Sequence, residues 1–376
     1  MKVVDVAAWY GPTTGGIRTY LHAKARWASL NGHDHATVVP GEANQACSDG
    51  GANVVSVRGR TPTGRWGYRV WVRPGPIIAA LERLQPDVIV LNDVISFPTA
   101  LGKWASRRGI PVAMICHADA TAAVSGTGRA VAAPAEILLR GMQRRALRVP
   151  DAVIAPSLQT AHRIEGGPHL LVVGSGLGVD LDTFGAATFD SALRREFAPN
   201  GEIVLLAVGR LSSEKRLDLA IRALATLPPS IVLVIAGSGP GALGLARLAD
   251  RLGVTNRIHF VGFLSDRAEL ARLMATADCF VHANPHEPFG LAPLEALAAG
   301  CRVVVPASAG CAEICGRRGG VLVDPGSADA LAAGILGALK NPKPRPDLEA
   351  FSWSHTFERE WALYSRLAAT ASLVAA

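Results

Sequence analysis

Residues 203–224 read IVLLAVGRLSSEKRLDLAIRAL, an apolar run followed by a charged loop and an amphipathic segment. Residues 203–208 are apolar without interruption, which is typical of a strand that is buried on both faces of a sheet. The segment DLAIRAL (218–224) has apolar side chains at helical spacing. Strands that alternate with helices build parallel sheets with right-handed crossovers. This stretch therefore predicts one unit of an α/β fold.

The same alternation recurs along nearly the whole chain and falls into two series. Apolar runs of the first series lie at 2–8, 36–40, 53–57, 87–92, 111–117, 151–157 and 170–176. Those of the second series lie at 203–209, 231–237, 257–263, 279–284, 302–307 and 320–324. The two series are separated by LGVDLDTFGAATFD (177–190), which is rich in Gly, Asp and Thr. Such a break near mid-chain predicts a linker between two domains.

We therefore predict an α/β protein of two doubly wound, Rossmann-like domains with parallel sheets. The N-terminal domain spans 1–185 and the C-terminal domain spans 186–355. Residues 356–376 form an amphipathic helix that we expect to pack back toward the N-terminal domain. Ligands of doubly wound folds bind beyond the carboxyl ends of the strands, and a cleft faced by both domains is the expected site.

The composition is that of a well-buried globular chain with an anionic partner. Hydrophobic residues make up 49% and charged residues 18% of the 376 residues, and the formal net charge is +7 at pH 7. A surplus of this size fits a phosphorylated ligand, an anionic membrane surface or nucleic acid. We identify no nucleic-acid-binding module, so we expect no nucleic-acid partner.

The cysteines and the N-terminus favour a cytoplasmic chain. The six cysteines are scattered and form no Cys-x-x-Cys pair, so we expect them to be reduced. Asp5 interrupts the first apolar run, which is unlike a signal peptide. No apolar run is long enough to span a bilayer, so membrane contact is expected only as peripheral contact at the inner face.

Paired glycines follow two of the strand-like runs. Gly15 and Gly16 precede a predicted helix, where backbone N–H groups can approach a phosphate closely. Gly237 lies in VIAGSGPG (234–241), a second glycine-rich turn after a strand. A plain tight turn explains both segments as well as a phosphate site does.

Cations follow the strand with which we began. Gly209 ends that strand, and Arg210, Lys215 and Arg216 occupy the loop and the helix start. Cations at a helix N-terminus oppose the helix dipole, so this placement costs stability unless an anion is present. The conflict favours an anion-binding site. A solvated run of charges is the alternative.

Two carboxylates lie on either side of a predicted helix start in HEPFGLAPLEALAAG (286–300). Glu287 is in the loop after a strand, and Glu295 is on the helix that follows. The backbone N–H groups of residues 289–291 lie between them. Carboxylates accept hydrogen bonds from vicinal hydroxyls, whereas amides and cations bind phosphate. The combination suits a sugar nucleotide.

Three of these segments also carry a family resemblance: GRLSSEKR (209–216), IAGSGPG (235–241) and EPFGLAPLEALAAG (287–300). In their order and spacing they resemble the retaining glycosyltransferases of family 4, which have the GT-B fold. Further matches are TTGGIRTYL (13–21), GLGVDLDTF (176–184) and GGVLVDPGSADALA (319–332). Residues 67–89 and 351–364 look most like actinobacterial members that use GDP-mannose, including phosphatidylinositol mannosyltransferases.

The resemblance implies a role for each matching position in the C-terminal half. Arg210 and Lys215 would hold the diphosphate of the donor and stabilise the leaving group, and Glu295 would bond to the nucleotide ribose. Glu287 would hold the transferred sugar. The N–H groups that would assist it belong to Phe289, Gly290 and Leu291.

Other positions correspond to the glycine loops and to one histidine. Gly16 would give the first loop access to the phosphates, and Gly15, Gly209 and Gly237 belong to the same kind of donor-binding loop. His117 corresponds to a histidine near the transferred sugar in relatives. One departure is Ser238, because many members of the family have Asp there.

The resemblance further implies hexosyl transfer with retention, from GDP-mannose first and a UDP-sugar next, to a hydroxyl of a lipid-linked or small polar acceptor. No metal and no cofactor besides the nucleotide sugar are expected. Without an obvious nucleophile, the acceptor would attack the face that the diphosphate leaves, and Glu287 would only position the sugar. The basic segment 140–149 is either a membrane-facing patch or a solvated helix face.

Two other functions remain possible at this point. A non-catalytic sugar-nucleotide or lipid-binding protein on the same scaffold would also explain the site, although the intact charged residues argue against it. A hydrolase would use Glu287 and Glu295 as an acid/base pair. The placement of one on a loop and one on a helix, beside Arg210 and Lys215, disfavours that arrangement.

Overall fold

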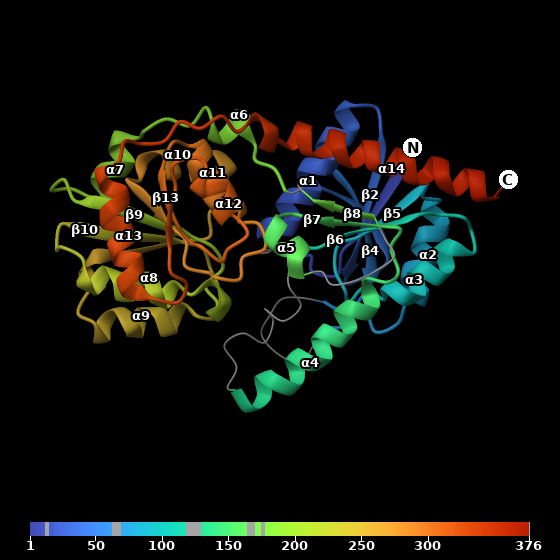
Figure 1. Ribbon diagram of the computed structural model, residues 1–376, viewed down its shortest axis with the longest axis horizontal. Helices are drawn as coiled ribbons and strands as arrows, with labels where there is room; N and C mark the ends of the chain where they lie inside the picture. Colours follow the sequence, from blue (N-terminus) through green and yellow to red (C-terminus); the bar gives the residue numbers. More distant parts are fainter. Residues whose placement is uncertain (12–14, 62–68, 118–128, 164–169, 174–176, 376) are drawn as a thin grey trace. The chain divides into compact units, whose positions relative to one another are not determined.

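The structure is a computed structural model that describes residues 1–11, 15–61, 69–117, 129–163, 170–173 and 177–375 (Figure 1). Its internal contacts divide the chain into two compact units. Unit 1 comprises Met1–Gly178 together with Trp353–Ala376, and unit 2 comprises Val179–Ser352. The predicted fold class is confirmed, because each unit is built on a largely parallel sheet whose strands are mostly connected through helices.

Unit 1 is built on an eight-stranded sheet of order β3-β4-β2-β1-β5-β6-β7-β8. Its strands are β1 (Lys2–Val6), β2 (Asp34–Gly41), β3 (Gln45–Asp49), β4 (Ala52–Arg58), β5 (Val88–Leu91), β6 (Val112–Ile115), β7 (Ala152–Ala155) and β8 (Leu170–Val173). Its helices are α1 (Gly15–Leu30), α2 (Gly75–Leu84), α3 (Pro98–Ser106), α4 (Arg129–Ala146), α5 (Leu158–Arg163) and α14 (Trp353–Ala375). The central strands β5, β6 and β7 are buried at every residue, as their uninterrupted apolar runs predict.

The edge strand β3 departs from the prediction of purely parallel sheets. It pairs with β4 in the antiparallel direction, and four of its five residues are exposed. Its sequence, QACSD, has no apolar run because the strand covers no core. Hydrophobic periodicity therefore carries no signal for it.

The C-terminal helix α14 packs on α1 around a buried ammonium group. Lys24 Nζ lies 2.9 Å from Asp5 Oδ2 and 3.3 Å from Glu360 Oε2, and all three side chains are buried. The hydroxyl oxygens of Tyr20 and Tyr364 each accept a hydrogen bond of 3.0 Å from the same Nζ. An unpaired buried charge costs several kcal/mol, so these partners are what allow Lys24 to lie here.

Unit 2 is built on a six-stranded parallel sheet of order β11-β10-β9-β12-β13-β14. Its strands are β9 (Ile203–Val208), β10 (Ile231–Ala236), β11 (Ile258–Gly262), β12 (Cys279–Val281), β13 (Arg302–Pro306) and β14 (Val321–Val323). Its α-helices are α6 (Leu181–Phe184), α7 (Ser191–Phe197), α8 (Leu217–Thr226), α9 (Ala242–Arg251), α10 (Arg267–Thr276), α11 (Leu291–Ala298), α12 (Ala312–Gly316) and α13 (Ala328–Lys340). Short 3₁₀ turns are η2 (Ser213–Lys215), η3 (Thr255–Arg257) and η4 (Glu349–Phe351).

One core cluster of unit 2 joins the sheet to α8 and α13. Leu205, Leu233, Ile221 and Ile335 are each at most 1% exposed. Burying an aliphatic side chain of this size contributes about 1.5–3 kcal/mol. These residues come from the apolar faces of the strand–helix unit quoted at the start and of its neighbours, so the local pattern and the tertiary packing agree.

The sequence placed the domain boundaries at residues 185 and 355. The boundaries of the two units lie a few residues earlier, after Gly178 and after Ser352. Residues 179–184 belong to unit 2 because Val179 bridges to Ser352 and because α6 contacts α10 and α11. Asp180 caps α6 by accepting a hydrogen bond of 3.1 Å from the Thr183 N–H. Part of the predicted linker 177–190 is therefore a helix N-terminus.

Candidate functional site

The predicted donor-binding residues of unit 2 lie after three neighbouring strands of its sheet. Gly209 and Arg210 follow β9, Gly237 follows β10, and Glu287 lies in the loop between β12 and α11. Because these strands are parallel and adjacent, their carboxyl ends meet at one edge of the sheet. The order β10-β9-β12 is not readable from the sequence, and it brings segments about 80 residues apart to one edge.

A partly buried ion pair joins two of these segments. Lys215 Nζ donates a hydrogen bond of 2.7 Å to Glu287 Oε2, and Asn284 Nδ2 donates one of 3.2 Å to the same oxygen. His282 Nε2 lies 3.7 Å from that oxygen. Burial raises the pKa of Glu287, but Lys215, His282 and Asn284 together lower it to about 2. The carboxylate is therefore ionised at neutral pH and acts as a hydrogen-bond acceptor, not as a general acid.

The histidine beside this pair is neutral. Burial lowers the pKa of His282 to about 4, because the effects of Glu287 and Lys215 on it oppose each other. Among the described residues, no group forms a hydrogen bond with its buried Nε2. An unsatisfied buried nitrogen costs free energy, so it marks a position at which a ligand hydroxyl can supply the missing partner.

The loop cations each have a carboxylate partner, which corrects the dipole argument made from the sequence. Arg210 lies 2.6 Å from Glu214 and Arg216 lies 3.1 Å from Asp218, in addition to the pair formed by Lys215. Arg216 precedes α8 with a left-handed backbone, φ +50°. The charges are thus largely balanced within unit 2, because acidic side chains two to 72 residues away fold against them.

The second predicted carboxylate, Glu295, is already occupied. It lies on α11, is 4% exposed, and accepts a hydrogen bond from the guanidinium of Arg267, the first residue of α10. The Arg267 guanidinium lies 4.8 Å from the centre of the Phe184 ring. One carboxylate oxygen faces this arginine. Sequence reasoning did not find Arg267, because nothing in its local pattern separates it from a solvated helix charge.

The start of α11 offers backbone donors between the two carboxylates. Among the described residues, none accepts a hydrogen bond from the N–H groups of Phe289, Gly290 or Leu291. Gly290 has φ +91°, and a Cβ there would lie 2.8 Å from Cys311 Sγ. A hydrogen bond of 2.6 Å from the Gly310 N–H to the Glu287 carbonyl holds this loop in place. A preorganised set of amides next to a cation suits an anionic or hydroxyl-rich ligand.

The glycines after β9 and β10 bring their two loops into contact. A Cβ on Gly237 would lie 1.9 Å from the Gly209 carbonyl oxygen, and Gly237 has φ +147°. Leu211 N–H donates a hydrogen bond of 3.0 Å to the Ser238 carbonyl. Close packing between loops therefore requires these glycines, whether or not a phosphate approaches them.

In unit 1, the predicted residues lie at the first helix and after β6. Gly15 and Gly16 begin α1 and are exposed, whereas Thr13 and Thr14 of the same motif lie outside the described residues. His117 follows β6, and its Nε2 lies 2.7 Å from Asn92 Oδ1. Burial lowers the pKa of His117 to about 3, so its imidazole is neutral at pH 7.

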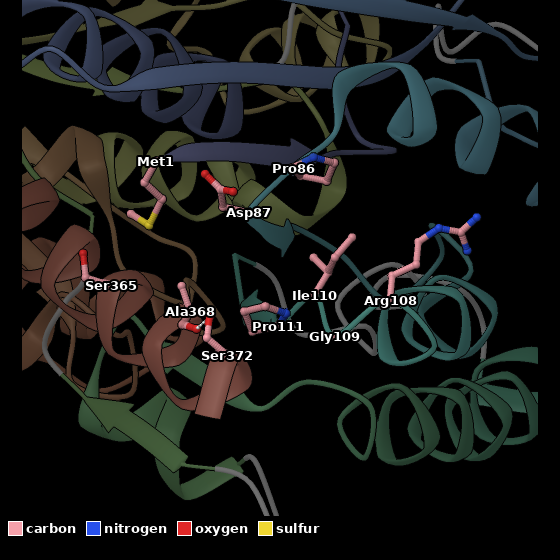
Figure 2. A pocket seen from close by; sticks show the side chains of 10 residues that line it. All are labelled: Met1, Pro86, Asp87, Arg108, Gly109, Ile110, Pro111, Ser365, Ala368 and Ser372. Carbon is pink, nitrogen blue, oxygen red and sulfur yellow. Dashed lines mark hydrogen bonds between the residues drawn. The ribbon is translucent and has the colours of Figure 1, made fainter. Parts of the chain in front are cut away.

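A separate pocket of about 470 Å³ lies at the opposite edge of the sheet in unit 1. It is lined by Met1, Asp87 and Pro111, at the amino ends of β1, β5 and β6, and by residues of α14 that include Ser365 (Figure 2). Ligands of doubly wound folds bind at the carboxyl ends, so this pocket is not a donor site.

Two further results concern metals and membranes. Within the described part of the chain, no three His, Cys, Asp or Glu side chains converge as metal ligands would. No helix among the described residues is long and apolar enough to cross a bilayer. The expected absence of a metal stays a prediction.

Solved structures share this fold over nearly the whole chain. Sucrose-phosphate synthase from Thermosynechococcus elongatus superposes with a TM-score of 0.80 over 98% of this chain and 100% of that chain, at 19% identity. HepE from Anabaena, in complex with UDP and glucose, gives a TM-score of 0.69 over 100% and 98% of the two chains, at 21% identity. The fold of the chain is therefore GT-B.

Two family models cover most of the sequence. Residues 14–173 match Glycosyltransferase Family 4, and residues 189–352 match Glycosyl transferases group 1. Together with the relatives below, these matches show the family. The chain belongs to glycosyltransferase family 4 and is a retaining hexosyltransferase that uses a nucleotide sugar.

Two similar proteins are glycosyltransferases of mycobacteria. The chain is 33% identical over 367 residues to a GDP-mannose-dependent alpha-(1-6)-phosphatidylinositol dimannoside mannosyltransferase of Mycobacterium tuberculosis, covering 94% of this chain and 93% of that protein. It is 35% identical to a D-inositol 3-phosphate glycosyltransferase of Mycolicibacterium paratuberculosis, over 50% of this chain and 46% of that protein.

Proposed function

We propose that the chain transfers mannose from GDP-mannose to a hydroxyl of a lipid-linked acceptor, with retention at the anomeric carbon. The observation that carries the choice of donor and acceptor is the similarity to the mannosyltransferase of Mycobacterium tuberculosis over 94% of the chain. The partly buried Lys215–Glu287 pair, with its neighbouring amides, supports a catalytic site over a decayed binding site. A decayed site would have little reason to keep an ion pair that is partly withdrawn from water at this edge.

The reaction assigns one task to each charged group. The bond between the sugar C1 and the donor phosphate oxygen breaks, and the acceptor oxygen bonds to C1 from the same face. The acceptor proton passes to the departing phosphate, so the products are the mannosylated acceptor and GDP. Lys215 and Arg210 stabilise the negative charge that develops on the diphosphate.

Two carboxylates and a set of backbone N–H donors position the sugar and the nucleoside. Glu287 accepts hydrogen bonds from sugar hydroxyls and stays ionised throughout, since its pKa is about 2. The N–H groups of Phe289, Gly290 and Leu291 donate to the sugar or the phosphate. Glu295 accepts from the ribose with the oxygen that Arg267 does not engage. Gly15 and Gly16 let the first loop approach the phosphates.

A donor and acceptor screen tests this function. The protein is incubated with radiolabelled GDP-mannose, UDP-glucose or UDP-N-acetylglucosamine, and with phosphatidylinositol mannosides or soluble inositol phosphate. The expected result is labelled lipid from GDP-mannose alone. Label on the soluble acceptor would overturn the lipid assignment, and transfer from a UDP-sugar would overturn the donor assignment. Binding of a donor without any turnover would favour the non-catalytic alternative.

The exposed face of α4 supports peripheral contact with an anionic membrane. Ile137 and Leu138 are 73% and 65% exposed, and Met142 is 41% exposed. The same helix carries exposed basic side chains at Arg140, Arg144 and Arg145, and the exposed Arg148 follows its end. Exposed apolar and basic groups on one helix fit the interface of an anionic bilayer, where each cation contributes about 1 kcal/mol.

Sedimentation with vesicles tests the membrane contact. Phosphatidylcholine vesicles with and without phosphatidylglycerol are compared, and binding is expected only to the anionic ones. The variant Arg145→Glu/Arg148→Glu should lose this binding, whereas Arg247→Glu/Arg251→Glu on α9 serves as a charge-matched control. Unchanged sedimentation of the α4 variant would show that the face is merely solvated.

A further inference from the structure

Three polar side chains lie in a row at the carboxyl ends of adjacent strands in unit 1. The neighbouring strands β1, β5 and β6 position Asp5, Asn92 and His117, respectively. Asn92 Nδ2 lies 2.7 Å from Asp5 Oδ1, and Asn92 Oδ1 lies 2.7 Å from His117 Nε2. Asp5 and Asn92 are 0% and 2% exposed, so water does not compete for these bonds. The row links a buried carboxylate to the histidine that the family resemblance places near the sugar.

The surroundings of Asn92 decide which way its amide points. Its nitrogen faces three oxygens that can only accept: Asp5 Oδ1 at 2.7 Å, the Val90 carbonyl at 3.4 Å and the Val6 carbonyl at 3.5 Å. A reversed amide would place its own oxygen against these three acceptors. The NH₂ group therefore faces Asp5, and the amide oxygen faces His117.

This orientation selects one tautomer of His117. An amide oxygen can only accept, so His117 Nε2 must carry the proton and Nδ1 must be the unprotonated nitrogen. Burial keeps the imidazole neutral, with a pKa of about 3. Nδ1 is buried and has no hydrogen-bond partner among the described residues. The ring thus presents a single unused acceptor, which a hydroxyl group can satisfy.

Two further contacts hold the row in place. Asp5 stays ionised because Lys24 Nζ lies 2.9 Å and His35 Nε2 lies 2.8 Å from its second oxygen, and these partners outweigh burial and lower its pKa. The Tyr20 ring packs edge-on against the imidazole at 4.9 Å between centroids, which restricts rotation of His117. Tyr20 in turn donates a hydrogen bond of 2.7 Å to Glu360 on α14.

We propose that Asn92, itself oriented by Asp5, is a positioning residue that holds His117 in the Nε2–H tautomer, so that Nδ1 accepts a hydrogen bond from a substrate hydroxyl. The inference rests on the proposed function, because the hydroxyl belongs to the sugar or the acceptor of the transfer reaction. Asn92 does not contact substrate in this scheme and acts only through His117. Loss of Asn92 frees the second tautomer, in which Nδ1 would be a donor and could not accept.

Nitrogen NMR of the full chain tests the tautomer directly. The ¹⁵N shifts of protonated and unprotonated ring nitrogens are well separated, and His117→Gln assigns the signal among the ten histidines. At pH 7, the wild-type chain should show Nε2 protonated and Nδ1 unprotonated. Asn92→Ala should show a mixture of both tautomers. A wild-type signal from the Nδ1–H tautomer would overturn the proposal.

A double-mutant cycle tests the consequence for catalysis. Asn92→Ala should lower kcat roughly tenfold, which is within the coupling expected for residues of one hydrogen-bond network. In a His117→Ala background, the same substitution should change kcat by less than about threefold, because its only route of action is gone. An equal loss of kcat in both backgrounds would mean that Asn92 serves only the stability of the fold.

Two controls separate the possible failures. Val54→Ala on β4 truncates a buried side chain of the same sheet without touching the row, so it should lower thermal stability but leave kcat and the His117 signals unchanged. GDP affinity of Asn92→Ala should also stay unchanged. If the wild-type chain transfers no sugar from any donor, the proposed function fails, and the tautomer measurement alone then decides the present inference.

Discussion

Replacing Lys215 by alanine separates the structural role of the partly buried ion pair from its role in catalysis. The ammonium lies 2.7 Å from Glu287 Oε2, and the two side chains are 27% and 16% exposed. The pKa of Glu287 is lowered from 4.5 to about 2, and one pKa unit corresponds to about 1.4 kcal/mol. The favourable surroundings of this carboxylate are therefore worth about 3 kcal/mol at neutral pH.

Lys215 is the largest of the influences that lower this pKa, ahead of His282 and Asn284. Because the pair keeps some access to water, we expect Lys215→Ala to lower the free energy of unfolding by about 1–2 kcal/mol. If the ammonium also stabilises the departing diphosphate, kcat should fall about 10²- to 10³-fold, as for other preorganised donors. The two effects are measured on the same protein.

The double variant Lys215→Ala/Glu287→Gln distinguishes the two roles. It removes the uncompensated carboxylate, so stability should return most of the way to that of the wild type. Activity should not return, because no cation faces the diphosphate. Arg69→Ala, which breaks the exposed pair with Glu42, is the control and should cost less than about 1 kcal/mol.

Urea unfolding followed by circular dichroism measures the stability of the whole chain. All seven tryptophans lie at or before Trp104 or at and after Trp353, so fluorescence reports on unit 1 alone. Transfer of label from GDP-mannose measures kcat. A Lys215→Ala variant that keeps kcat within threefold of the wild type would refute the role at the diphosphate. Unchanged stability of that variant would refute the argument from the ion pair.

Three other substitutions test separate parts of the structure. Because the pKa of Glu287 is lower in the folded chain, its contribution to the free energy of unfolding is present above about pH 4.5 and is lost toward pH 2. In acid unfolding curves, Glu287→Gln should therefore lose less stability over this pH range than the wild type does. Gly290→Ala places a Cβ at φ +91° and 2.7 Å from the Cβ of Cys311. It should lower the free energy of unfolding by about 1–3 kcal/mol and reduce donor binding in calorimetry. As a control, the Cβ of Gly337→Ala on α13 meets no atom within 4 Å, so this variant should stabilise the chain slightly. Lys24→Met leaves Asp5 and Glu360 buried without their cation, so the free energy of unfolding should fall by about 3–5 kcal/mol. Urea unfolding followed by tryptophan fluorescence measures this change. An unchanged urea midpoint would show that the buried cluster does not hold α14 in place.

Much of the fold could be predicted because it depends on local periodicity. Uninterrupted apolar runs such as 203–208 and 231–236 became central strands, since burial on both faces demands apolar side chains at every position. The helix α11 begins at Leu291 and carries Glu295, as the glycine and apolar pattern indicated. The edge strand β3 escaped prediction because an exposed strand needs no apolar face.

The partners of the charged residues could not be predicted in the same way. Lys215 and Glu287 are 72 residues apart, and Arg267 and Glu295 are 28 apart, yet each pair shares a hydrogen bond. Which cation meets which carboxylate depends on the order of strands in the sheet, and many orders fit one pattern of alternation. The sequence argument consequently treated the loop cations as unpaired.

The sequence by itself determined two α/β domains, the family, and the positions in the chain at which the donor-binding groups stand. Those features reside in periodicity and in short contiguous motifs, which need no knowledge of distant contacts. Only the tertiary structure decided that Glu287 is ionised beside Lys215, that Glu295 is engaged by Arg267, and that His117 meets Asn92. Each of these depends on burial and on a partner from another strand end, because an ionisable group takes its charge and tautomer from its surroundings.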